Sequence, residues 1–520
     1  MTKPSDSGKD NIIIIGGGHN GLVCATYLAK AGRQVTVFEA AGQVGGAAIT
    51  REFAHGFKVS AGAHILNLLD QDIRKDLALD SLGLQISQTH LSTIALSEAG
   101  DHLTFNGNKV TGAGVSAEDQ AGMVEYHRFM TRFAGIIGGL HNDIPPRMRL
   151  NNRKDLFSLA KTAWNIRRMG TADMREFLRI AGINIYDILN ENFEHPMIRG
   201  ALSMDGVLGS FLGPRSNNSV FGALHRWSGG NVNSIVAGGM GALTEVLAKA
   251  ARKQGVRIET ASPVTHIMME NGRACGVELE GGEQFRAGTV ISNADPKTTF
   301  FRLLGARHLE AGFVRKVQNI RMRGNASKLH LALDGMPEFT GLDQNQVGQR
   351  LLIAPDIEYV ERAFNHSKYG EHSIEPVAEI SIPSLNDETL SPDGQHVLSA
   401  VVQYTPYELK NGWPEARQAF TDKTIDLIAK YAPGIRDLIV AAELLTPVDI
   451  EKEFRIHGGH WHHGELALDQ FMMMRPVPGA AQYHAPIDNL YLCGAGSHPG
   501  GGVMGSAGRN AANAILRDQQ

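Results

Sequence analysis

The distribution of apolar residues is most informative at the start of the chain. Residues 12–15 are four consecutive isoleucines, and a short run that is apolar throughout is typical of a parallel strand buried on both faces. Residues 22–31 have the pattern of a helix, and Gly32 stands where a glycine commonly ends one. Residues 34–38 predict a second strand. The first forty residues therefore predict a strand–helix–strand unit.

Three glycines and one acidic residue give this unit a nucleotide-binding pattern. Gly16, Gly18 and Gly21 form G-x-G-x-x-G between the first strand and the helix. The first permits a tight turn, the second lets a pyrophosphate approach the backbone, and the third lets the helix pack on the strand. Glu39 ends the second strand, where a carboxylate can bind a ribose hydroxyl. Because no arginine neighbours Glu39, the pattern favours FAD or NAD over NADP.

Residues from about 70 to 240 predict mostly helices and no runs typical of parallel strands, which indicates an insertion that leaves the nucleotide-binding domain. The predicted helices are 117–137, 153–169 and 173–188, the last with a capping pattern from Thr171. The helix at 153–169 combines an apolar face with a basic one. We favour packing on the core with a solvated basic face, and the alternative is a peripheral contact with a membrane surface.

The remaining pattern alternates short strands with helices. After a glycine-bounded helix that ends at Gly255, strands are predicted at 256–260, 264–270, 274–279, 284–286 and 289–292, and then at 327–333, 350–354, 377–382 and 396–404, with a helix at 414–430. The predicted fold class is α/β. Its nucleotide-binding domain is built from residues 1–105, 236–325 and 481–520, and its substrate domain from a helical part, 106–235, and a part with sheet and helices, 326–480.

Composition narrows the functional classes. At 520 residues the chain is long enough for two or more domains. A net charge of −4 gives no electrostatic basis for a nucleic-acid partner. The three cysteines contain no C-x-x-C pair, which argues against a vicinal redox dithiol and a four-cysteine zinc site. The polar first nine residues and the lack of a long apolar run lead us to expect a cytoplasmic protein.

Two further glycine-rich segments suit close approach to a ligand. Gly45 and Gly46 follow the second strand directly, where backbone can run beneath the same cofactor. Residues 490–509 predict a strand, a glycine-rich loop and the start of a helix. The free N–H groups and dipole at that helix N-terminus would stabilise negative charge, such as that on the N1–C2 edge of a reduced flavin.

These segments together resemble the FAD-dependent superfamily of amine oxidases and phytoene desaturases. The resemblance rests on the N-terminal unit, on 44–48 (Val-Gly-Gly-Ala-Ala), on 290–296 (Val-Ile-Ser-Asn-Ala-Asp-Pro) and on the C-terminal glycine cluster. Residues 17–23, 490–505 and 464–478 are similar in more detail to the family of pyridine nucleotide-disulphide oxidoreductase domain-containing protein 2 and its bacterial relatives. The disulphide chemistry in that name is not supported by paired cysteines, and Ser60 occupies a position that is acidic in the superfamily.

The resemblance implies a two-domain flavoprotein with the p-hydroxybenzoate hydroxylase-like fold and a Rossmann-like FAD-binding domain. FAD would lie extended between the N-terminal glycines and the C-terminal loop. The residues expected to bind it are Gly16, Gly18, His19, Asn20, Gly21, Glu39, Gly45, Gly46, Ala47, Val264, Asn293, Gly494, Gly496, Gly502, Val503 and Met504.

Two histidines are candidates for catalysis. His463 matches the His-Gly-Glu motif of the narrower family, and a neutral imidazole can act as a base or hydrogen-bond donor. If its segment is extended, His460 and His462 point one way and His463 the other. A structural cluster is an equal alternative, and a metal site is disfavoured because ligands must converge on one ion. His64, like His498, lies in a loop expected near the flavin, where a structural role is the alternative.

Three functions fit this reading. The first is FAD-dependent dehydrogenation or desaturation of an apolar small molecule, with oxygen, a quinone or another diffusible acceptor reoxidising the flavin. The second is flavin-dependent isomerisation of the carotene isomerase type. The third is a binding protein on the same fold without flavin, which the intact glycines and Glu39 argue against. Amine oxidation stays an alternative substrate class. Trp461 and the run Met472–Met474 are expected to pack in the core or to line an apolar wall near the substrate.

Overall fold

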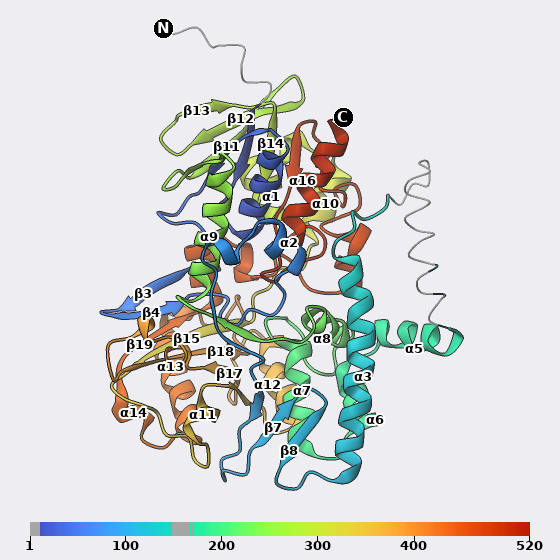
Figure 1. Ribbon diagram of the computed structural model, residues 1–520. Coiled ribbons are helices and arrows are strands. Elements are labelled where there is room, and N and C mark those ends of the chain that lie inside the picture. Colours follow the sequence, from blue (N-terminus) through green and yellow to red (C-terminus); the bar gives the residue numbers. More distant parts are fainter. Residues whose placement is uncertain (1–10, 148–163, 165–166, 168–169, 520) are drawn as a thin grey trace.

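The computed structural model describes residues 11–147, 164, 167 and 170–519, and Figure 1 draws the other residues as a grey trace. In Figure 1 a nucleotide-binding half, with the parallel strands and helices α1 and α16, stands above a half built on a larger sheet. The basic helix predicted at 153–169 lies outside the described residues apart from two positions. Among the described residues, no helix is long and apolar enough to cross a membrane.

The upper half is built on a five-stranded parallel sheet in the order β10-β2-β1-β14-β20. Ile13 at its centre pairs with Thr36 of β2 and Val290 of β14, so the isoleucine run is buried on both faces as predicted. Helices α1, α9 and α16 pack together beside the sheet. The bounds are β1 Asn11–Ile15, β2 Gln34–Phe38, β10 Arg257–Glu259, β14 Thr289–Ser292, β20 Leu490–Leu492, α1 His19–Lys30, α9 Met240–Lys253, α16 Ser506–Asp518 and α2 Gln71–Asp76.

Smaller sheets flank this core. Strands β11 Val264–Glu270, β12 Arg273–Leu279 and β13 Gln284–Arg286 form an antiparallel sheet at the top of Figure 1, which confirms the strands predicted there. The hairpin of β3 Thr50–Ala54 and β4 Phe57–Ser60 extends to one side. A six-residue π-helical segment at Thr298–Leu303 follows β14, and α10 covers Ala311–Gln318.

The lower half contains an eight-stranded sheet in the order β19-β15-β18-β17-β16-β6-β7-β8. Leu352 of β16 packs with the helices on one face, whereas Leu351 and Ile353 pack against α13 on the other. This period of two explains why the strands are apolar throughout. The bounds are β6 Thr93–Ala95, β7 Leu103–Asn106, β8 Lys109–Gly112, β15 Ala326–Leu333, β16 Arg350–Ile353, β17 Val377–Ser381, β18 His396–Gln403, β19 Ile439–Leu445, α11 Gln344–Val347, α13 Trp413–Ala429, α14 Ile435–Leu438 and α15 Pro447–Phe454.

The helical face of this sheet is covered by segments distant in sequence. The long helix α3 Ala117–Leu140 runs down the side of the molecule in Figure 1. With it pack α6 Ile185–Asn192, α7 Pro196–Val207, α8 Ser219–Trp227 and α12 Ile357–Lys368. Helix α5 covers Thr171–Gly182.

Two predictions for this part of the chain are wrong. Helices make up most of the secondary structure between residues 70 and 240, as predicted, but the expected lack of parallel strands is wrong, because β5 Ile86–Thr89, β6–β8 and β9 Ser234–Val236 lie there and β6 pairs in parallel with β16. Runs of three or four residues are too short for periodicity to identify. The helix predicted at 173–188 is divided into α5 and α6, because Asn184 caps α6 by accepting a hydrogen bond from the N–H of Asp187 at 2.9 Å. The division of the chain into domain segments stays a prediction.

Candidate functional site

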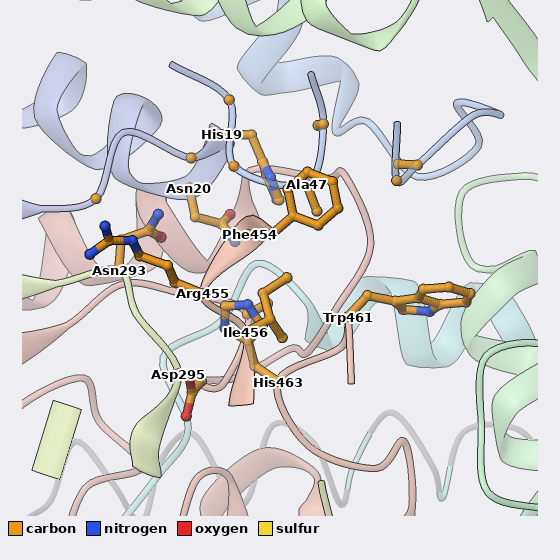
Figure 2. Close-up of a pocket in the computed structure, with 18 of the residues that line it drawn as sticks. His19, Asn20, Ala47, Asn293, Asp295, Phe454, Arg455, Ile456, Trp461 and His463 are labelled. Atoms are coloured by element: carbon orange, nitrogen blue, oxygen red, sulfur yellow. The ribbon is translucent and has the colours of Figure 1, made fainter. Parts of the chain in front are cut away.

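One large cavity, about 1860 Å³ of space including its open mouth, joins the two halves of the molecule. Its wall begins at the carboxyl ends of β1 and β2, which is where ligands bind in open α/β sheets. It continues past 45–48 and 62–67 to Glu379 of β17 and Val401 of β18 in the lower sheet. Figure 2 shows this cavity with its labelled side chains.

The glycines shape the upper part of the cavity. Gly16 has φ +96° and Gly45 φ +126°, conformations that favour glycine. A Cβ on Gly18 would come within 2.8 Å of the Asn293 side-chain nitrogen, and a Cβ on Gly21 within 2.3 Å of the Gly16 carbonyl oxygen. Gly18 therefore keeps the cavity wall open, whereas Gly21 serves the packing of α1 on β1.

Glu39 lies where the wall leaves β2. One of its oxygens accepts the Gly17 N–H at 2.6 Å and the other accepts the Ala41 N–H at 2.8 Å. A carboxylate has about four acceptor positions, so two remain for hydroxyl donors of a ligand. The residue is thus fixed in place by backbone donors and still able to bind a ribose.

Most residues expected to bind the cofactor line this cavity, namely Gly16, Gly18, His19, Asn20, Glu39, Gly45, Gly46, Ala47, Val264, Asn293, Gly502 and Val503. The other four are not among the lining residues: Gly21, Gly494, Gly496 and Met504. Gly494 is closely packed, since a Cβ there would lie 2.4 Å from the Asn293 carbonyl oxygen. Direct contact between these sixteen residues and the cofactor stays a prediction, as does stabilisation of flavin charge by the N-terminus of α16.

The histidine segment differs from the prediction. A 3-10 turn at His457–Gly459, with φ +64° at Gly458 and +61° at Gly459, replaces the extended path. The His463 N–H then donates to the His460 carbonyl at 2.8 Å. As a result His462 and His463 both line the cavity, whereas buried His460 lies 3.6 Å from Glu465. The expected alternation is wrong because residues 460–463 form a turn, in which His463 itself has φ +54°, and not an extended strand.

Several polar atoms in the cavity wall lack a hydrogen-bond partner among the described residues. They include Nε2 of His19, Oδ1 of Asn20 and Nδ1 of both His462 and His463. Burial lowers the pKa of His19 and of His463 to about 4, in His463 against the opposing effect of Asp295. Both imidazoles are therefore neutral at pH 7. Buried polar atoms without partners are costly, and a polar ligand in the cavity would satisfy them.

At the lower end of the cavity, His64 meets a buried charged network. Its Nε2 lies 3.0 Å from Glu379, which also binds Arg226 at 3.0 Å and Arg350 at 2.5 Å. The same arginines lie 3.3 and 2.7 Å from Asp205. Burial lowers the pKa of His64 to about 4, and the two arginines hold the pKa of Glu379 well below its usual range. Because Glu379 stays ionised, it accepts the proton of Nε2 and leaves Nδ1 of His64 as an acceptor.

Other residues of the wall had not been identified as site residues from the sequence. Asp295 lies in the loop after β14, Arg302 in the π-helical segment, and Phe454 and Arg455 at the end of α15, whereas Glu379 lies in an apolar strand. Only Asp295 stands in a run that the sequence had marked, 290–296. The remaining residues belong to no local motif.

The residues for which the sequence left a packing role open also differ in their positions. Trp461 lines the cavity, as an apolar wall residue should. Met472–Met474 form a 3-10 turn that is not among the lining residues. His498 is buried, and its Nε2 lies 2.8 Å from the Leu140 carbonyl oxygen, which is a structural contact. Among the described residues, no group of three or more His, Cys, Asp or Glu could hold a metal ion.

The polar groups and the shape of the cavity suit FAD. Glu39 can bind a ribose, the glycines and the start of α1 leave room and N–H groups for a diphosphate, and the cavity continues far enough toward the lower sheet to take a ring system. The fold and cavity therefore define a two-domain flavoprotein. The family model of flavin containing amine oxidoreductases matches residues 21–516, and the chain belongs to this family. It is an FAD-dependent oxidoreductase.

Known proteins resemble this chain over its whole length. Pyridine nucleotide-disulfide oxidoreductase domain-containing protein 2 of Mus musculus is 35% identical over 97% of this chain and 93% of its own. A subunit of the limonene dehydrogenase of Castellaniella defragrans is 25% identical over 98% and 94%. The solved cyclohexylamine oxidase of Brevibacterium oxydans covers 98% of this chain and 99% of its own with a TM-score of 0.57 at 15% identity. The last likeness shows the fold.

Proposed function

We propose that this protein dehydrogenates a neutral, largely apolar small molecule, with oxygen, a quinone or another diffusible acceptor taking up the electrons. A carbon–carbon single bond of the substrate would lose a hydride and a proton and become a double bond. The observation that carries the proposal is the pairing of charges at the lower end of the cavity. The relationship to one chain of a limonene dehydrogenase supports it.

A protonated amine that is buried in a cavity must lie next to a carboxylate that is not already paired with another cation. Glu379 is the carboxylate at the lower end of the cavity, and together with Asp205 it faces the guanidinium groups of Arg226 and Arg350. Two carboxylates and two guanidinium groups leave no net negative charge. Alkylamines are protonated at pH 7, so burying one here would cost the desolvation of its charge without a matching anion. A neutral substrate avoids that cost.

The wall around this network is suited to an apolar molecule. Leu208, Val401, Ile450 and Trp461 line the cavity with the paired charges. Trp461 is held against the chain at Gly209, where a Cβ would lie 2.4 Å from the indole ring. These side chains would orient the substrate and exclude water from the reacting C–H bond.

Bound FAD supplies hydride acceptance at its N5 atom. A side chain of the protein must then accept the proton that the substrate loses. We propose His463 for this role because its Nδ1 has no partner among the described residues and its imidazole is neutral. The hydrogen bond from Nε2 of His64 to Glu379 would fix the ring of His64, whose Nδ1 lies 3.4 Å from the Ser381 hydroxyl.

The test is anaerobic reduction of the FAD-loaded protein, followed by loss of the flavin absorbance. We would compare limonene with cyclohexylamine, which differ in charge at pH 7 and are both built on a six-membered ring. Reduction by the hydrocarbon alone, with a product two hydrogens poorer, supports the proposal. Reduction by the amine alone contradicts the substrate class. A hydrocarbon product of unchanged composition would indicate isomerisation instead.

A further inference from the structure

Two arginines in the wall of the cofactor cavity have no carboxylate partner among the described residues. Arg302 belongs to the π-helical segment after β14, and Arg455 follows the end of α15. Neither takes part in an ion pair, whereas Arg226, the third arginine of the wall, is paired with both Glu379 and Asp205. Both unpaired arginines are exposed at the mouth of the cavity.

The carboxylates close to these arginines are already engaged. Asp295 accepts the N–H and hydroxyl of Thr298 at 2.9 and 2.6 Å and the N–H of His457 at 3.2 Å. Glu451 accepts a hydrogen bond from the Tyr407 hydroxyl and lies 3.7 Å from His457. These hydrogen bonds occupy the two carboxylates, and neither carboxylate forms an ion pair with Arg302 or Arg455.

Further cations gather at the same place. Lys297 and Lys452 line a smaller pocket that shares Arg302 and Arg455 with the cofactor cavity, and Glu451 is the one carboxylate among its lining residues. Lys297 is partly buried, and burial lowers its pKa despite the opposing effect of Asp295. Like charges placed together repel one another unless an anion lies between them. The pocket thus has the electrostatics of an anion site that opens into the cofactor cavity.

The opposite wall offers the anionic part of a cofactor no cationic side chain. Helix α1 begins with His19, which is neutral because burial lowers its pKa to about 4. The segment 40–48 beside Gly45 and Gly46 contains no basic residue. On this side backbone N–H groups, the helix dipole and neutral side chains such as that of Asn20 face the ligand, and none of them carries a full positive charge.

We propose that Arg302 and Arg455 bind the diphosphate of FAD from the side opposite to α1. The diphosphate is the anionic part of FAD and carries two charges, which equals the number of unpaired arginines in the wall. Figure 2 shows the Arg455 side chain extending to the side of the cavity where Asn293 and Asn20 lie. Guanidinium groups bind phosphate through paired, charge-assisted hydrogen bonds. The inference rests on the FAD assignment and is independent of the proposed substrate.

Equilibrium binding of flavins to the apoprotein tests this assignment without any substrate. Flavin fluorescence would be titrated with FAD and with riboflavin, which has the same ring system and no phosphate. We would compare the natural protein, R302Q, R455Q and the double variant. R315Q is the matched control, because Arg315 is an exposed arginine of α10 outside both pockets.

We expect each variant to weaken FAD binding about tenfold, because hydrogen bonds to charged groups have about that effect, and to change riboflavin binding less than twofold. The affinity for FAD should also depend less steeply on salt concentration in the double variant. An unchanged FAD affinity in the double variant would overturn the proposal. An equal loss for FAD and riboflavin would also overturn it, since that result indicates a distorted cavity. Neither result would affect the substrate test, which uses the natural protein.

Discussion

Replacement of Lys328 by methionine tests the electrostatics of the lower sheet directly. Lys328 lies in β15, is fully buried, and donates a hydrogen bond from Nζ to the Ser399 hydroxyl at 2.9 Å. Burial lowers its pKa from 10.5 to about 7, although nearby Glu379 acts in the opposite direction. Methionine has a similar length and no charge, so it fills the same space and removes the titration.

The size of the effect follows from the two pKa values. In the unfolded chain the lysine keeps a pKa near 10.5, so between pH 7 and 10.5 the unfolded state binds the proton more tightly than the folded state. Above pH 10.5 Lys328 is neutral in both states and does not lower the free energy of unfolding. As the pH drops from 10.5 to about 7, the free energy of unfolding falls. The total loss is about 4.8 kcal/mol, of which about 2.7 kcal/mol falls between pH 9 and pH 6.

Urea unfolding at several pH values between 6 and 9 measures this change. The stability of Lys328→Met relative to the natural protein should rise by about 2.7 kcal/mol between pH 9 and pH 6. The other titrating groups are common to both proteins and cancel in the difference. Lys316→Met is the control, because Lys316 lies on the exposed side of α10 and its replacement should act equally at both pH values.

A difference between Lys328→Met and the natural protein that does not change with pH would refute the reasoning. It would mean that Lys328 has the same proton affinity in the folded and unfolded chain. Burial of its ammonium group would then be fully compensated by Glu379.

Three further replacements test the cofactor end of the cavity. Gly18→Val should prevent FAD binding, because its side chain would occupy the space beside Asn293, and retention of the FAD absorbance by the purified protein would contradict this. Gly21→Ala should lower the unfolding free energy by about 3 kcal/mol, since its Cβ would press on the Gly16 carbonyl, whereas Gly42→Ala meets no atom within 4 Å and should have little effect in the same denaturation assay. His463→Ala should keep FAD bound and slow flavin reduction by substrate about 100-fold or more in anaerobic stopped-flow measurements, and an unchanged rate would assign the residue a structural role.

The nucleotide-binding part of the fold could be predicted because its signals are local. The isoleucines of 12–15, the spacing of the glycines and the position of Glu39 each reflect contacts within forty residues. Gly21 illustrates the point, since the carbonyl that excludes its Cβ belongs to Gly16, five residues away. The strands β6–β8 gave no such signal, because each is only three or four residues long and the parallel pairing of β6 is with β16, far away in the chain.

The substrate end could not be predicted for the same reason. His64 follows β4, Arg226 lies in α8, Glu379 in β17 and Asp205 in α7, and these residues meet only after the sheet and helices have packed. In sequence, Glu379 is a single acidic residue within an apolar strand. The turn at 460–463 could not be predicted either, because the left-handed conformation of His463, with φ +54°, is uncommon for a residue other than glycine.

The two ends of the cavity differ in their charged side chains. This difference helps to decide whether the substrate is a charged amine or a neutral molecule. At the mouth, Arg302 and Arg455 present positive charge without carboxylate partners among the described residues. At the far end, Arg226 and Glu379 belong to a set whose charges cancel. In the FAD-loaded protein the diphosphate would neutralise the two arginines at the mouth, so the charge balance at the far end decides the substrate class. A cationic amine would find there no carboxylate that is not already paired with an arginine, whereas an apolar molecule needs none.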